Sequence, residues 1–236
     1  MPLTKTYLTK SRFQIGMECP TKLYYHLNSK EYANQKLDDT FLAALAKGGF
    51  QVGALAQAHY PEGILVKEES NQAAIQKTRE LLEQENCTLF EAAIEAGPFI
   101  IRIDILKKTG KRFELFEVKA KSYHPDDGGF YTAKGTIKST WKPYLYDVSF
   151  QQMVLQKAYP ASSISSFLML ADKSKVATVD GLNQKFRIIE ENGRFKVETA
   201  AIASVAELGQ KILIRIPVDD EVKHLQNEEF ELGGGI

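Results

Sequence analysis

Only two of the 236 residues are cysteines, Cys19 and Cys87. Two thiols are too few for the disulfide framework of a small secreted scaffold or for a zinc site made of cysteines alone. The opening segment MPLTKTYLTK lacks the apolar stretch of a signal peptide. No apolar run approaches the roughly 18 residues of a membrane span. These absences predict a cytoplasmic protein that does not enter a membrane.

The chain also lacks an excess of charge, because 30 lysine and arginine residues balance 30 aspartate and glutamate residues. No overall field attracts it to nucleic acid, so a nucleic-acid surface would have to be a local basic patch. Apolar residues make up 44% of the chain, which is near the average of soluble globular domains. Without repeats or low-complexity tracts, residues 1–236 are expected to form a single domain around a sizeable core.

Hydrophobic periodicity and turn residues predict alternating helices and strands. Helices are expected at residues 8–27, 39–60, 71–85, 147–158 and 201–212. Strands are expected at residues 64–66, 88–94, 99–106, 112–120 and 166–171, followed by a β-rich segment at 175–197. Residues 28–39 and 121–146 are expected to be loops, and the second is long enough to be functional.

Local signals refine three of these helices. Ser11 and Asp147 are the expected N-caps of the helices at 8–27 and 147–158. Pro20 is expected to kink or restart the first helix, because proline cannot donate a backbone hydrogen bond inside it. The helix at 39–60 contains three glycines that indicate a break or close packing, namely Gly48, Gly49 and Gly53.

The strands at 99–106 and 112–120 contain a group of charged residues near a turn at 108–111. Side chains alternate between the faces of a strand, so Glu117 and Lys119 share one face. Phe116 and Val118 point to the other face, into apolar surroundings. A turn centred between residues 110 and 111 would place Asp104 opposite Glu117, with Cβ atoms roughly 4.5–5.5 Å apart.

Two carboxylates at that spacing can bind one cation, and Mg²⁺ prefers oxygen ligands and keeps several waters. Beside such an ion, Lys119 could position or deprotonate an attacking water, or stabilise charge on a phosphate. The pattern therefore indicates phosphodiester hydrolysis. The same pattern also fits a solvated hairpin face with a cross-strand ion pair, because a bare Asp, Glu and Lys pattern recurs by chance in charged proteins.

Several blocks of sequence carry a family resemblance. They are residues 8–13 (LTKSRF), 19–24 (CPTKLY), 102–106 (RIDIL), 116–122 (FEVKAKS) and 147–151 (DVSFQ). Together they resemble the RecB-like branch of the PD-(D/E)XK nuclease superfamily, which includes the CRISPR-associated RecB-type exonucleases. The resemblance covers a core of about residues 8–171. Leu155 stands where the last motif of that branch has a tyrosine.

The resemblance implies an α/β fold with a restriction-endonuclease-like mixed central sheet flanked by helices. It implies Mg²⁺ or Mn²⁺ as the cofactor and nucleic acid as the partner, DNA rather than RNA. Gln151 would contact the substrate or support the active site. The full expected site has Asp104, Glu117, Glu91 and the carbonyl of Val118 on the metal, Lys119 as the catalytic lysine, and Gln151, Lys121 and Tyr144 at the substrate.

Two groups that accompany this family are missing. No cysteine follows Cys87, so an iron–sulfur cluster with four thiolates is not expected, and Cys19 is expected to be a small packed residue. Gly53 stands where the family's metal-binding histidine would be. His59 could replace that histidine, although a solvent-facing histidine before a turn is the preferred interpretation.

Residues 49–63 also resemble a bacterial subgroup in which a further C-terminal region follows the nuclease-like domain. We therefore expect a β-rich and helical extension at 172–230, a linker at 231–236 and a further domain beyond this chain. The favoured function is a metal-dependent nuclease in DNA processing, repair or defence. The alternatives are a catalytically weak or inactive nucleic-acid-binding module of a larger protein, and an effector that acts on RNA.

Overall fold

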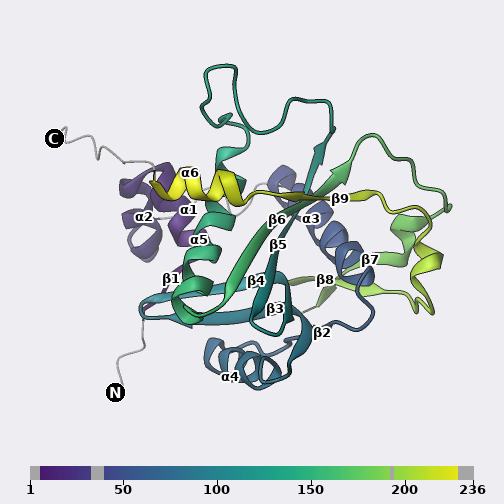
Figure 1. The fold of residues 1–236 in the computed structure, drawn as a ribbon, viewed down its shortest axis with the longest axis horizontal. Coiled ribbons are helices and arrows are strands. Elements are labelled where there is room, and N and C mark those ends of the chain that lie inside the picture. Colours follow the sequence, from purple (N-terminus) through teal and green to yellow (C-terminus); the bar gives the residue numbers. More distant parts are fainter. Residues whose placement is uncertain (1–5, 33–39, 192–193, 228–236) are drawn as a thin grey trace.

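The computed structural model describes residues 6–32, 40–191 and 194–227 (Figure 1). Its centre is a mixed sheet in the order β2-β3-β4-β5-β6-β9, with β1 beside β4. The strands are β1 (Leu8–Thr9), β2 (Ile64–Leu65), β3 (Asn86–Ala96), β4 (Phe99–Thr109), β5 (Arg112–Tyr123), β6 (Ser163–Asp172) and β9 (Leu213–Pro217). The predicted fold class, a mixed α/β sheet flanked by helices, is confirmed.

Strands β3, β4 and β5 form an antiparallel meander, and β6 lies parallel to β5. Antiparallel neighbours can be joined by tight turns, and Gly97 and Gly110 supply the positive φ angles of the two turns. A parallel neighbour needs a crossover. Helix α5 (Lys142–Ala158) forms the crossover between β5 and β6.

Strand alternation separates the core into one cluster on each face of the sheet. Leu115 and Val148 belong to the cluster beneath α5, whereas Phe116 and Leu55 belong to the cluster beneath α3 (Thr40–Ala58). Figure 1 shows the same division, with α1 (Lys10–Glu18), α2 (Pro20–Leu27), α5 and α6 (Asp219–Asn227) on one side and α3 on the other. A third cluster lies beneath α4 (Asn71–Leu81). None of the described helices is long and apolar enough to cross a membrane.

The prediction of the first helix is wrong for its start and correct for the break at Pro20. Leu8 and Thr9 form β1, and the Thr9 hydroxyl, rather than that of Ser11, accepts the capping hydrogen bond from the backbone N–H of Arg12. Pro20 starts the second helix, α2. Helix α3 continues through its glycines, and a Cβ at Gly48, Gly49 or Gly53 would meet nothing within 4 Å. The expectation of a break or of close packing at these glycines is therefore wrong.

The loop expected at 121–146 is shorter, because β5 extends to Tyr123 and α5 starts at Lys142 with Trp141 as its N-cap. Asp147 therefore lies inside α5 and does not cap it. Near the C-terminus, the helix predicted at 201–212 is wrong. A short 3-10 turn (Val205–Leu208) precedes β9, and the final helix is α6.

The remaining strands, β7 (Phe186–Glu191) and β8 (Arg194–Thr199), form a separate two-stranded sheet beside α3. The β-rich character expected for residues 175–197 is thus present. Strand β9 joins the main sheet by pairing with β6, and α6 packs against α5. The expected linker at 231–236 lies outside the described residues.

Candidate active site

The site forms where the ladder between β4 and β5 stops. The pairing runs from Thr109 opposite Arg112 up to Ile105 opposite Phe116, which confirms the predicted turn centre. One step further, Asp104 and Glu117 face each other. There the Asp104 Oδ2 atom accepts a hydrogen bond of 2.7 Å from the backbone N–H of Val118. At this point the Asp104 side chain, instead of the backbone of β4, accepts the hydrogen bond from β5.

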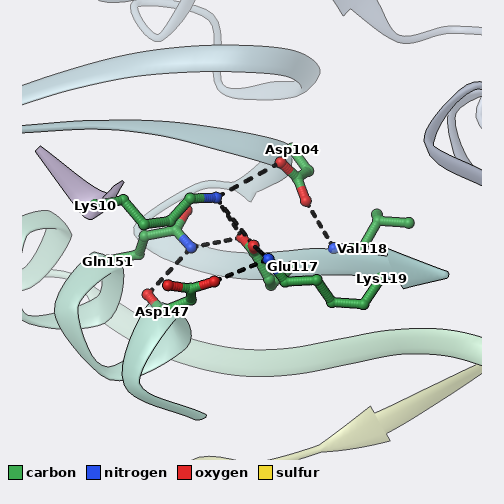
Figure 2. A network of polar contacts seen from close by, with 7 residues as sticks. All are labelled: Lys10, Asp104, Glu117, Val118, Lys119, Asp147 and Gln151. Carbon is green, nitrogen blue, oxygen red and sulfur yellow. Dashed lines mark hydrogen bonds and ion pairs between the residues drawn. The ribbon is translucent and has the colours of Figure 1, made fainter. Parts of the chain in front are cut away.

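Glu117 is the centre of the site, and its side chain is only 1% exposed. Its Oε1 atom lies 2.9 Å from Lys10 Nζ and 2.7 Å from Lys119 Nζ. Its Oε2 atom lies 3.0 Å from Lys10 Nζ and 2.6 Å from Gln151 Nε2. Figure 2 shows these groups converging from β5, α5 and the start of α1. A buried carboxylate with so many donors is held in one orientation.

The environment moves the pKa values of the two facing carboxyl groups apart. Burial and the negative charge of Glu117 raise the pKa of Asp104 to about 7. Burial acts in the same direction on Glu117, but the ammonium groups of Lys10 and Lys119 outweigh it and lower its pKa to about 2. At neutral pH the pair therefore contains one fixed negative charge and one carboxyl group that is close to its midpoint.

Lys119 lies between two carboxylates, with its Nζ atom 2.7 Å from Glu117 and 2.8 Å from Asp147. Burial would lower the pKa of this lysine, but the two negative charges and their hydrogen bonds raise it. Lys119 therefore stays protonated at neutral pH. Of the two roles considered from the sequence, charge stabilisation and positioning are the ones that an ammonium can perform as it stands.

Asp147 is a site residue that the sequence argument missed. It lies in the second turn of α5 with a side chain that is 2% exposed, and its Oδ2 atom accepts from Lys119. Its Oδ1 atom is buried without a hydrogen-bond partner among the described residues. The spacing contained a signal, because Asp147 and Gln151 are four residues apart and so share one face of a helix.

Lys10 is the second missed residue, and it comes from the opposite end of the sequence. It is the first residue of α1, and its Nζ atom lies within 3.0 Å of both Glu117 oxygens and 3.9 Å from Asp104 Oδ1. The motif LTKSRF contains it. Nothing in a single sequence indicates that residues 10 and 117 meet.

Glu91 lies at the edge of the site on β3. Phe90 pairs with Ile105 and Ala92 with Ile103, which leaves Glu91 opposite Asp104. Glu91 has a φ of 54°, the only positive φ of a described non-glycine residue. Such a backbone conformation is uncommon outside glycine and often marks a functional position. Burial raises the pKa of Glu91, although Lys10 and Arg102 act against it.

The three residues expected at the substrate lie in two places. Gln151 is fully buried and donates to Glu117, so it supports the site from beneath. Lys121 lies on β5 past the carboxylates, with its ammonium 4.7 Å from the ring centre of Trp141 and 5.3 Å from that of Tyr144. The Tyr144 ring is also 5.8 Å from Lys119 Nζ. Lys121 and Tyr144 therefore form a basic and aromatic border beside the lysine of the site.

Outside the site, the expectation for Cys19 is wrong and that for His59 holds only in part. Cys19 is exposed and is not a packed residue. His59 is half-buried and does not simply face solvent, because its Nε2 atom is buried and has no hydrogen-bond partner in the described part of the chain. Burial and the charge of Lys211 lower the pKa of His59. Among the described residues, no hydrogen bond or ion pair joins His59 to Asp104 or Glu117.

The donor chemistry of the site fits a hard divalent ion. Asp104 and Glu117 face each other, and neither histidine nor cysteine accompanies them, which favours Mg²⁺ or Mn²⁺ over zinc. Within residues 6–32, 40–191 and 194–227, no group of three or more His, Cys, Asp or Glu side chains could hold a metal ion. An ion here would depend on two carboxylates, main-chain oxygen and water, as Mg²⁺ commonly does.

Comparisons with known proteins add little. No protein-family model matches the chain, and no curated protein matches it. Among solved structures, the chain is similar to an alkaline exonuclease from Laribacter hongkongensis. The identity is 12% and the TM-score 0.35, with 93% of this chain and 81% of that chain covered. A likeness of this size does not identify a family, so the function must be argued from the site itself.

Proposed function

We propose that the protein is a metal-dependent nuclease that hydrolyses phosphodiester bonds, with DNA as the substrate and Mg²⁺ or Mn²⁺ as the cofactor. The observation that carries the proposal is the convergence of Asp104, Glu117 and Lys119 at the end of the β4–β5 ladder. The sequence pattern alone also fits a solvated hairpin face. A Glu117 side chain that is 1% exposed does not fit that alternative.

Each residue has a distinct role in this proposal. Asp104 and Glu117, with the carbonyl of Val118, would hold the ion directly, and Glu91 would contribute from β3 through a bound water. A bound divalent ion supplies a Lewis acid and lowers the pKa of a water. The Lys119 ammonium donates hydrogen bonds to the reacting phosphate and opposes the charge that builds on it. Gln151 and Asp147 orient Glu117 and Lys119 from α5.

Lys121 and Tyr144 are the proposed contacts to the nucleic acid. A lysine contacts phosphate oxygens, and an aromatic ring at the same border can stack on a base. Tyr144 suits this role better than Trp141, because Trp141 is only 8% exposed and packs against Tyr123 and Phe130. The basic groups are local to this border, as a chain with a net charge of +0 requires.

A cleavage assay tests the proposal. The purified chain is incubated with end-labelled single- and double-stranded DNA and with RNA, in Mg²⁺, in Mn²⁺ and in EDTA. We expect cleavage of DNA that depends on the metal and is absent in Asp104→Asn. If the wild-type protein leaves all substrates intact with both metals, or if Asp104→Asn cleaves as fast as the wild-type protein, the proposal is wrong.

The raised pKa of Asp104 predicts how metal binding depends on pH. A proton on Asp104 competes with the ion, and the pKa of this group is raised to about 7. Below pH 7, the apparent Mn²⁺ affinity should therefore fall by about tenfold per pH unit, and above pH 7 it should level off. Calorimetric titrations at pH 6, 7 and 8 check this, and equal affinities at pH 6 and pH 8 would contradict it.

One observation favours a second candidate function, a nucleic-acid-binding module with weak or no catalysis. Both oxygens of Glu117 already accept hydrogen bonds from side chains of the protein itself. A metal ion therefore cannot bind Glu117 unless one of these donors moves away. Binding of labelled DNA without cleavage, in the same assays, would support this alternative.

The proposed nuclease function has three secondary parts. They are a cytoplasmic location, a role in DNA processing, repair or defence, and a further C-terminal domain.

A further inference from the structure

The hydrogen-bond capacity of Glu117 leads to an inference about Lys10. A carboxylate has about four lone-pair sites, two on each oxygen. The Oε1 atom faces Lys10 and Lys119, and the Oε2 atom faces Lys10 and Gln151. All of these sites therefore have donors. An ion that binds Glu117 must displace one of the donors.

Lys10 is the donor that can be displaced at the lowest cost. Gln151 is fully buried in α5, and Lys119 is also held by Asp147. The side chains of Lys10 and Lys119 are similarly exposed, at 23% and 25%, but helix α1, which carries Lys10, contains no buried residue. In the described residues, the carboxylates within ion-pair distance of Lys10 are Glu117 and Asp104 alone.

Lys10 also occupies the position that an ion would need. Its Nζ atom lies 2.9 and 3.0 Å from the two oxygens of Glu117 and 3.9 Å from Asp104 Oδ1, within reach of both carboxylates (Figure 2). An ion shared by these two side chains would have to come within a few ångströms of the same ammonium. Since like charges repel strongly where water is scarce, an ammonium and a divalent ion cannot both stay beside the same carboxylate pair.

We propose that Lys10 is a tethered counter-ion that closes the Asp104–Glu117 pair in the metal-free protein and that a divalent ion binds by displacing its ammonium. Metal affinity is then set by a residue far from both ligands in sequence, at the junction of β1 and α1. This inference rests on the proposed function only because it takes Asp104 and Glu117 as the metal ligands.

The test is a Mn²⁺ titration of the full chain by calorimetry, with Lys10→Met and Lys10→Arg. Methionine keeps the length of the side chain and removes its charge, so Mn²⁺ should bind about ten- to a hundredfold more tightly, as loss of one charge-assisted hydrogen bond to the competitor implies. Arginine keeps the charge and binds carboxylates with two parallel hydrogen bonds, so Mn²⁺ should bind more weakly than to the wild-type protein.

Lys77→Met is the matched control, because Lys77 is an exposed lysine that pairs only with Glu80 on α4 among the described contacts. It should leave Mn²⁺ binding unchanged. Unchanged or weaker binding in Lys10→Met would overturn the inference. If that variant does not fold, binding to Lys10→Arg that is as tight as to the wild-type protein would overturn it. The inference would also be overturned if neither the wild-type protein nor any variant bound Mn²⁺.

The two proposals can fail separately. An affinity order of methionine above lysine above arginine, without any cleavage of nucleic acid, would support the role of Lys10 and refute the nuclease function. Metal-dependent cleavage with equal Mn²⁺ affinities across the three proteins would support the nuclease function and refute the role of Lys10.

Discussion

Glu117→Gln is expected to lower the rate of DNA cleavage by about a thousandfold or more, because it removes the carboxylate that pairs with Lys119 and that would also hold the proposed ion. The same change should destabilise the fold by roughly 3 kcal/mol, the lower end of the range for a buried ion pair that loses one partner. The lower end applies because Asp104 and Asp147 remain near the two lysines. Cleavage kinetics and urea denaturation measure the two effects.

Glu114→Gln is the matched control, since Glu114 lies on the same strand and pairs with Lys107 and Arg215 near the surface. Exposed pairs contribute about 0–1 kcal/mol, so this variant should remain active and nearly as stable as the wild-type protein. Circular dichroism must show that Glu117→Gln is folded at the assay temperature. A folded Glu117→Gln protein that retains more than about a tenth of the activity would contradict the assigned role.

Lys119→Met should lower the cleavage rate by about a hundred- to a thousandfold while Mn²⁺ still binds. The ammonium is held between Glu117 and Asp147, which keeps it protonated and aimed at the site. Methionine fills a similar volume but cannot donate a hydrogen bond to a phosphate. Single-turnover kinetics measure the cleavage rate, and a Mn²⁺ titration measures metal binding. The prediction is that the first falls while the second is kept.

Lys111→Met serves as the control for this prediction, since Lys111 is an exposed lysine in the turn between β4 and β5. It should cleave DNA at the wild-type rate. Loss of Mn²⁺ binding in Lys119→Met would show that the lysine acts on the metal ligands instead of on the substrate. Wild-type cleavage by Lys119→Met would remove Lys119 from the mechanism.

The part of the site that the sequence predicted is the part that depends on local rules. Strand alternation places Glu117 and Lys119 on one face and Phe116 and Val118 on the other, and these two apolar side chains do lie in the cluster beneath α3. The turn around Gly110 determines the register of β4 and β5. Both follow from residues that are close in sequence, where backbone geometry leaves few alternatives.

The missed features depend on contacts between distant segments. Lys10 reaches Glu117 only after β1 pairs with β4 at Phe99 and Ile100. Residues 201–212 have an apolar composition that suits a helix, but Gly209 takes a left-handed φ of 68°. The next residues then pair with β6 as strand β9. In both places tertiary pairing overrides local propensity, and one sequence does not contain that information.

The attachment of α1 has a consequence for how the protein opens. Helix α1 has no buried residue, and the stacking of Phe13 on Phe150 is its main aromatic contact with α5. Proteins open locally at free energies well below that of global unfolding, and weakly buried edges open first. Asp104 and Glu117 lie in the central strands β4 and β5, whereas Lys10 lies on such an edge. Amide exchange in α1 can therefore proceed while β4 and β5 stay protected. The backbone that carries Lys10 then opens at a lower free energy than the strands that carry its two carboxylate partners.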